Sequence, residues 1–150
     1  MTVSSIIHKE ISEDINILWT HCDNVIFKNF LQKTLKLNLI EFDDTYFGDN
    51  DIDIVLCNNR IMYLEKCIES AKFFHCPLMI VDHDNKTSNI MDNITFDISP
   101  ILQIAVSENI YQSWNKIADI VLPYRSDDKQ LINKWITEFK NLKTKSLILS

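Results

Sequence analysis

The stretch Asp53-Ile54-Val55-Leu56-Cys57 decides the fold class of this chain. It is short and almost continuously apolar, which is typical of a strand buried on both faces of a parallel sheet. A second stretch of the same kind, Leu78-Met79-Ile80-Val81, follows Pro77, whose fixed φ ends the preceding helix. The residues between the two stretches carry apolar positions at helical spacing. We therefore predict a β-α-β unit over residues 53–81.

The same alternation extends toward the N-terminus. Residues 15–19 and 37–42 are predicted to be strands, and Asp23 is predicted to cap the helix between them. The apolar positions of that helix are Val25, Ile26, Phe30 and Leu31. The helix inside the β-α-β unit begins near Asn58 or Asn59, and its apolar stripe comprises Ile61, Leu64, Ile68 and Ala71.

Toward the C-terminus, strands are predicted at 101–106 and 120–122, with a helix after Ser107. A last helix follows Ser126, and acidic residues in its first turn suit the helix dipole. Its apolar face comprises Leu131, Ile132, Trp135, Ile136, Phe139 and Leu142. With no linker or repeat in residues 1–150, we predict a single Rossmann-like α/β domain with a mainly parallel, doubly wound sheet of about five to six strands.

Gly48 is the only glycine among the 150 residues. A turn that cradles a phosphate needs glycines, because the backbone must approach the anion closely and visit φ > 0. One glycine cannot build the dinucleotide-binding turn, the Walker A loop or the nucleophile elbow. We therefore exclude these three classes and expect no cofactor.

Charge and segment composition exclude other classes. The net charge is −6 and only two basic residues are arginine, so nucleic acid is not expected as a partner. The first fourteen residues lack the apolar core of a signal peptide, and no apolar run is long enough for a membrane span. A cytoplasmic location follows as an expectation. Ile, Asn and Lys supply 50 of the 150 residues, which is typical of AT-rich genomes and points to a virus or a streamlined bacterium.

The four cysteines, Cys22, Cys57, Cys67 and Cys76, are irregularly spaced and form no C-x-x-C pair. Buried thiols in a reducing compartment are the favoured interpretation, ahead of metal binding or redox chemistry. We predict no metal site.

Candidate functional residues follow from the fold class, since doubly wound sheets bind ligands outside the carboxyl ends of their strands. The residues predicted at those ends are His21, Asn58, Asn59, Asp82, His83, Asp84, Ser107, Glu108, Tyr124 and Arg125. Among these residues, the stretch Asp82-His83-Asp84 has the side chains best suited to metal binding or proton transfer. Two carboxylates could hold a metal and a diphosphate, His83 could act as a general base, or the triplet could simply begin a solvated loop. Asn58 and Asn59 could bind a sugar or cap the next helix.

Three segments stand in a suggestive order: DIDIVLCNN at 51–59, CPLMIVDHD at 76–84, and IAVSE at 104–108 followed by IVLPYRSD at 120–127. Together they resemble the N-terminal half of the two-Rossmann-domain (GT-B) glycosyltransferases of the family-4 type. The resemblance implies that this half contributes an acceptor site, while sugar transfer takes place in a cleft completed by a second, donor-binding half. It covers roughly residues 51 to 127.

Departures from that family shape the functional expectation. The family has glycine in its hinge where this chain has Arg125, and a glycine-containing loop where this chain has residues 19–24. A donor-binding half is expected after the hinge, but one helix and residues 146–150 follow here. We therefore expect a catalytically incomplete domain that acts as a binding, structural or assembly module, in host cytoplasm or a virus particle if viral. Self-association or a separate protein partner is expected, with a carbohydrate or nucleotide-sugar as the ligand.

The alternative is an enzyme. In it, His83 and Asp82 act at the acceptor side with Asn58, and another polypeptide or a second copy completes the cleft.

Overall fold

The structure is a computed structural model that describes residues 15–19, 24–41, 52–58, 61–83, 98–113, 118–145 and 148–149. The strands are β1 (Asn16–Trp19), β2 (Asn38–Glu41), β3 (Ile54–Asn58), β4 (Leu78–Asp82), β5 (Ile98–Ser99), β6 (Ile101–Ala105), β7 (Ile120–Val121) and β8 (Ile148–Leu149). The helical segments are α2 (Val25–Asn29), η1 (Phe30–Thr34), α3 (Ile61–Phe74), α5 (Glu108–Ser113) and α6 (Lys129–Lys143). No helix within these ranges is long and apolar enough to cross a membrane.

Six strands form one sheet in the order β2-β1-β3-β4-β6-β7, and every neighbouring pair is parallel. The predicted Rossmann-like α/β class is confirmed. β2 lies on one side of β1, and β3 and the later strands of this sheet lie on the other. The direction in which strands are added to the sheet therefore reverses between β1 and β3. This order, rather than 3-2-1-4-5-6, is the second common arrangement of doubly wound sheets. A separate pair, β5 and β8, is antiparallel and was not predicted.

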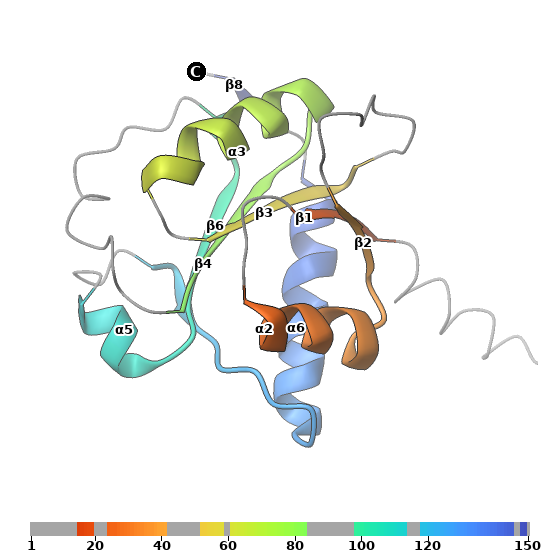
Figure 1. Cartoon of the computed structure of the whole chain (residues 1–150), viewed down its shortest axis with the longest axis vertical. Coiled ribbons are helices and arrows are strands. Elements are labelled where there is room, and N and C mark those ends of the chain that lie inside the picture. Colours follow the sequence, from red (N-terminus) through yellow and green to blue (C-terminus); the bar gives the residue numbers. More distant parts are fainter. Residues whose placement is uncertain are drawn as a thin grey trace, which may run out of the picture.

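Helices cover both faces of the sheet (Figure 1). On one face, α2, η1 and α6 pack over the side chains of Ile54, Leu56, Met79 and Val81. On the other, α3 and α5 pack over the alternate side chains of the same two strands. All ten residues of β3 and β4 are buried, as their apolar sequences predict.

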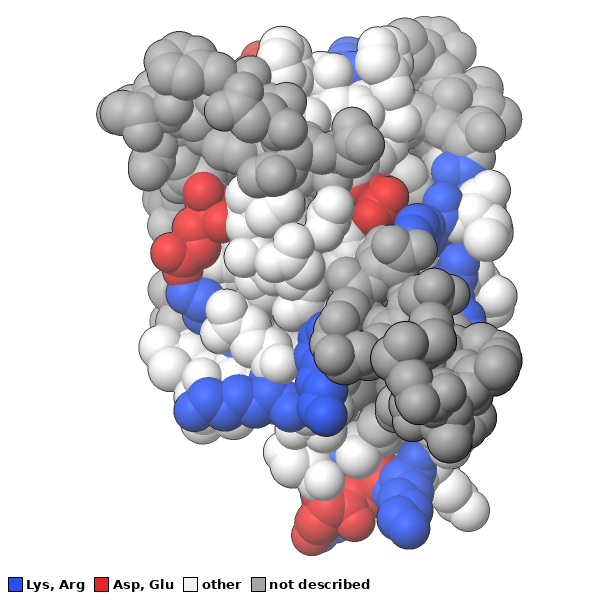
Figure 2. All heavy atoms as spheres, turned by 90° about the vertical axis from the view of Figure 1, so that its right-hand side faces the viewer, with Lys and Arg blue, Asp and Glu red and all other residues white. Residues whose placement is uncertain are grey.

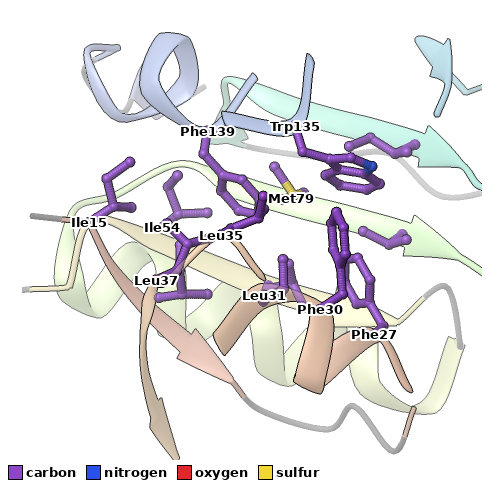
Figure 3. Packing of buried hydrophobic residues seen from close by; sticks show 14 of the residues in the cluster. Ile15, Phe27, Phe30, Leu31, Leu35, Leu37, Ile54, Met79, Trp135 and Phe139 are labelled. Carbon is purple, nitrogen blue, oxygen red and sulfur yellow. The ribbon is translucent and has the colours of Figure 1, made fainter. Parts of the chain in front are cut away.

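The core beneath α6 is aromatic. Trp135 points from α6 toward Phe27 and Phe30 of the α2–η1 segment, and Phe139 points into the same cluster beside Leu35 (Figure 3). The predicted apolar face of α6 is confirmed, because its three buried and three half-buried apolar residues all belong to this cluster.

The predicted face of the first helix is partly wrong. Val25 and Ile26 are 66% and 74% exposed, whereas Phe27 is fully buried. The cap explains the shift: the Asn24 side chain accepts a hydrogen bond from the Phe27 amide at 2.9 Å, so α2 begins at Val25. Asp23, the predicted cap, lies outside the described residues.

The start of α6 is set by Asp128. Its carboxylate accepts hydrogen bonds from the amides of Gln130 and Leu131, at 3.0 and 3.2 Å. Ser126 lies in the turn before the helix, and its hydroxyl is hydrogen-bonded by that of Thr34.

Two helical segments end in left-handed backbone without glycine. Lys36 has φ 58° after η1, and His75 has φ 53° after α3. The C-terminal end of α3 is a Schellman motif. The amides of His75 and Cys76 donate hydrogen bonds to the carbonyls of Lys72 and Ala71, respectively. Sites that usually favour glycine are thus filled by larger residues in this glycine-poor chain.

An aspartate precedes both β3 and β7 and ties each strand to its neighbour in the same way. The Asp53 amide donates to the Asn16 carbonyl, and the Asp53 carboxylate accepts from the Asn16 amide at 2.7 Å. Asp119 repeats both bonds with Gln103, and its carboxylate accepts at 2.8 Å. Each carboxylate thus supplies the acceptor that a longer strand would have provided.

We expect Asp53→Ala to lower the free energy of unfolding by about 1–2 kcal/mol, because the partly buried Asn16 amide loses its acceptor. Asp119→Ala should cost less, about 0.5–1 kcal/mol, because its bond to Gln103 is exposed. Urea denaturation at neutral pH measures both values. The control is Asp127→Ala, which removes an exposed ion pair with Arg125 and should change stability by less than about 0.5 kcal/mol. A loss for Asp53→Ala no larger than the control would contradict this role.

Candidate binding site at the carboxyl edge of the sheet

The candidate site lies where the parallel strands end. All six strands of the main sheet point the same way. Asn58 and Asp82, which end β3 and β4, therefore lie at the same edge as Ser107 and the residues after β7. Doubly wound sheets bind ligands at this edge, beside the point where the strand order reverses. Here that point lies between β1 and β3, and β3 carries Asn58 at its end.

Asn58 is a buried polar residue in the centre of this edge. Its exposed fraction is 6%, and it pairs with Val81 of β4 in the ladder. Ile54 and Leu56 face α2 and α6, so strand alternation places the Asn58 side chain on that face as well. The Cys57 thiol donates a hydrogen bond to the Asn58 carbonyl at 3.0 Å.

Asp82 and His83 lie on opposite faces of the sheet. Asp82 is the last residue of β4 and is 1% exposed, and alternation with Leu78 and Ile80 directs it toward α3 and α5. The ring of His83 instead lies against Phe27, on the face covered by α2. The two residues predicted to act together are therefore neighbours in sequence but are separated by the sheet.

His83 belongs to an aromatic cluster. Its ring centroid lies 4.9 Å from that of Phe27 and 5.8 Å from that of Tyr124, both in edge-on arrangements. Tyr124 also contacts Phe27 at 4.9 Å and Phe30 at 5.4 Å. Trp135 closes the cluster from α6, at 5.4 Å from Phe27. Aromatic packing of this kind fixes the His83 ring.

Tyr124 links the cluster to the cap of α2. Its side chain hydrogen-bonds Asn24, the residue that caps the helix. Burial raises the pKa of the Tyr124 phenol above its usual 10.0, and the bond to Asn24 opposes part of that rise. Next to Tyr124, the Pro123 carbonyl accepts a hydrogen bond from the Trp135 indole at 2.9 Å. Residues 123–124 are therefore held by both α2 and α6.

Three other predicted site residues have structural contacts. Ser107 caps α5 by accepting from the Ile110 amide at 3.2 Å, which confirms the predicted cap. Glu108 is exposed and accepts a hydrogen bond from Gln112, four residues later on α5. Arg125 is exposed and pairs with Asp127 at 3.3 Å. His21, Asn59 and Asp84 lie outside the described residues.

The structure brings together Asn58, His83 and Tyr124 on the α2 face, and adds three residues that the sequence analysis did not assign to the site. These are Asn24, Phe27 and Trp135. Asn ranks with Asp as a helix cap, so the pair Asp23-Asn24 carried a usable signal for the cap. Nothing in the sequence connects Asn24 with Tyr124, one hundred residues away.

The described ranges contain no group of three or more His, Cys, Asp or Glu side chains that could hold a metal ion. Cys57, Cys67 and Cys76 are free and buried, as predicted for these three residues. Burial, together with the charge of Asp53, raises the pKa of Cys76 to about 12, so its thiol is not a nucleophile near neutral pH.

Comparison with known proteins yields no relatives. No protein-family model matches the chain, and neither the curated proteins nor the solved structures contain a significant match.

We expect Tyr124→Phe to lower stability at neutral pH by about 0.5–1 kcal/mol, because the bond to Asn24 is lost. The folded protein also holds the phenol proton more tightly than the unfolded chain does. Stability from this source is complete below pH 10 and declines above it, as the unfolded chain loses its proton first. Urea denaturation between about pH 8 and pH 11 should therefore show a smaller alkaline loss for Tyr124→Phe than for wild type. Equal alkaline losses would contradict the burial of this phenol.

Proposed function

We propose that this chain is a glycosyltransferase-like α/β domain that binds its ligand without transferring sugar. The segments that resemble the GT-B N-terminal half include β3, β4, the last two residues of β6, and β7. Their described polar residues Asn58, Asp82 and Ser107 lie at the edge where doubly wound sheets bind ligands. The composition, typical of AT-rich genomes, fits a virus or a streamlined bacterium as the source of such a binding or assembly module.

One observation carries the preference for binding over catalysis. The two side chains predicted to be catalytic are packed into the domain itself: both ring nitrogens of His83 are shielded from solvent, and Asp82 is 1% exposed on the opposite face. A general base must come within hydrogen-bond reach of the proton that it removes. His83 packed against Phe27 and Tyr124 is better suited to shaping a surface than to removing a substrate proton.

The chemistry of the α2 face favours a neutral, hydroxyl-rich ligand. Asn58 carries an amide at the end of β3, and Tyr124 is a half-buried aromatic residue on the same face, whereas Phe27 and Trp135 are fully buried and pack against Tyr124. Binding sites for small molecules combine an aromatic lining with few polar groups in this way. A carbohydrate, alone or as part of a nucleotide-sugar, has both the hydroxyl groups and the apolar ring face that such a lining accepts.

The test combines binding and turnover on the same samples. Purified protein is titrated calorimetrically with UDP- and GDP-sugars, and radiolabelled donors are used to follow transfer. We expect binding in the micromolar range, weakened at least about tenfold by Asn58→Ala, with no transfer. Asn133→Ala, which changes an exposed asparagine on α6, is the matched control and should bind as wild type does.

Two results would overturn the proposal. Sugar transfer above the protein-free blank, abolished by His83→Ala in a variant that remains folded, would establish the enzymatic alternative. If no sugar nucleotide binds at concentrations up to about 1 mM, the proposal that the ligand is a carbohydrate is rejected.

A further inference from the structure

The outer edge of β2 carries main-chain groups that are hydrogen-bonded to none of the described residues. β2 is the terminal strand of the sheet and pairs only with β1 among the described strands. The Asn38 amide donates to the Ile15 carbonyl, so Asn38 and Ile40 direct their main-chain groups toward β1. Alternation along the strand directs those of Leu39 and Glu41 outward. Two amides and two carbonyls are therefore presented at the edge.

β2 has two of the devices by which proteins protect an edge strand, a short length and one charged residue, but it has no proline, lysine or bulge. Its sequence, Asn38-Leu39-Ile40-Glu41, contains no proline and no lysine, and its register with β1 runs without a bulge. Glu41 is its one charge, and the Lys28 ammonium pairs with that carboxylate. Leu39 and Ile40 are half-buried, one on each face of the sheet.

The surface on this side is chemically mixed. Figure 2 shows the face at the right of Figure 1, where β2 lies, with uncharged atoms in its middle and acidic and basic side chains beside them. The ion pairs Lys28–Glu41 and Lys143–Asp53 supply opposite charges close together rather than a field of one sign. These charges present both signs to a second copy, although the chain as a whole has a net charge of −6.

We propose that two copies of the chain associate through β2, with the strands antiparallel and a two-fold axis passing between the two Ile40 residues. Leu39 of each copy then lies opposite Glu41 of the second copy. Because both residues direct their amides and carbonyls outward, this register forms four main-chain hydrogen bonds. The two Ile40 side chains meet on the α3 face, and no two like charges lie directly opposite each other.

A two-fold axis at Ile40 is favoured over one at Leu39 because of the direction in which the main-chain groups of β2 point. Centring the axis on Leu39 would oppose Glu41 to Leu37, whose amide is already bonded to the Leu31 carbonyl at 3.0 Å. The axis at Ile40 uses only groups that face outward. An isologous pairing of this kind closes at two copies, so a dimer is the expected product.

The interface is small, because β2 has four residues. A dimer held by so short a strand should be concentration-dependent rather than permanent. The inference goes beyond the proposed sugar binding and is independent of it, since β2 uses neither Asn58 nor the α2–Tyr124 cluster.

Sedimentation velocity from about 10 μM to about 1 mM tests self-association. Leu39→Pro removes an outward amide but no bond to β1, whereas Leu39→Ala removes the same side-chain packing and keeps the amide. We expect the proline variant to associate at least about tenfold more weakly than the alanine variant, with both folded by circular dichroism. Hydrogen exchange at the Leu39 and Glu41 amides of wild type should slow as concentration rises, while that at Asn38 and Ile40 should not change.

Either of two results would overturn the dimer: a strict monomer over the whole range, or association equally strong in both variants. If Leu39→Pro does not fold, the exchange pattern of the wild-type protein decides alone, and rapid, concentration-independent exchange at Leu39 and Glu41 rejects the proposal.

Discussion

Burial of β3 and β4 on both faces is the constraint on which the rest of this structure depends. Their ten residues include eight apolar side chains, and alternate members point to opposite sides of the sheet. Neither face can be left in water, so the chain must place helices on both. The parallel direction of β3 and β4 follows, because α3 carries the chain back over the sheet between them. That direction in turn gathers Asn58, Asp82 and Ser107 at one edge.

The main strands and helices could be predicted because buried segments have a recognisable spacing of apolar residues in the sequence. Each strand of the main sheet lies within two residues of its predicted range, and the apolar spacing of α6 matches its packing. Prediction was less successful where a single capping residue determines which side chains of a helix face the core. The cap at Asn24 determines that Phe27 enters the core and that Val25 and Ile26 face solvent. The short β5–β8 pair escaped because two-residue strands carry no usable periodicity.

The candidate site shows a different limit. Asp82 and His83 are adjacent in sequence, which suggested joint chemistry, yet a strand turns successive side chains to opposite faces. Conversely, Asn24, His83, Tyr124 and Trp135 come together from four distant segments. Local pattern located the edge correctly, whereas the grouping of residues on it depends on tertiary packing that one sequence does not display. The glycine-poor composition has a structural counterpart too, since Lys36 and His75 occupy left-handed positions that glycine usually fills.

Native-state hydrogen exchange tests the central constraint most directly. If β3 and β4 form the doubly covered centre, the amides of Val55, Leu56, Met79 and Ile80 should exchange only through global unfolding. Their exchange free energies should then equal the free energy of unfolding measured with urea. Values several kcal/mol lower at these four amides, with slower exchange elsewhere in the chain, would show that the stable centre lies in another part of the fold.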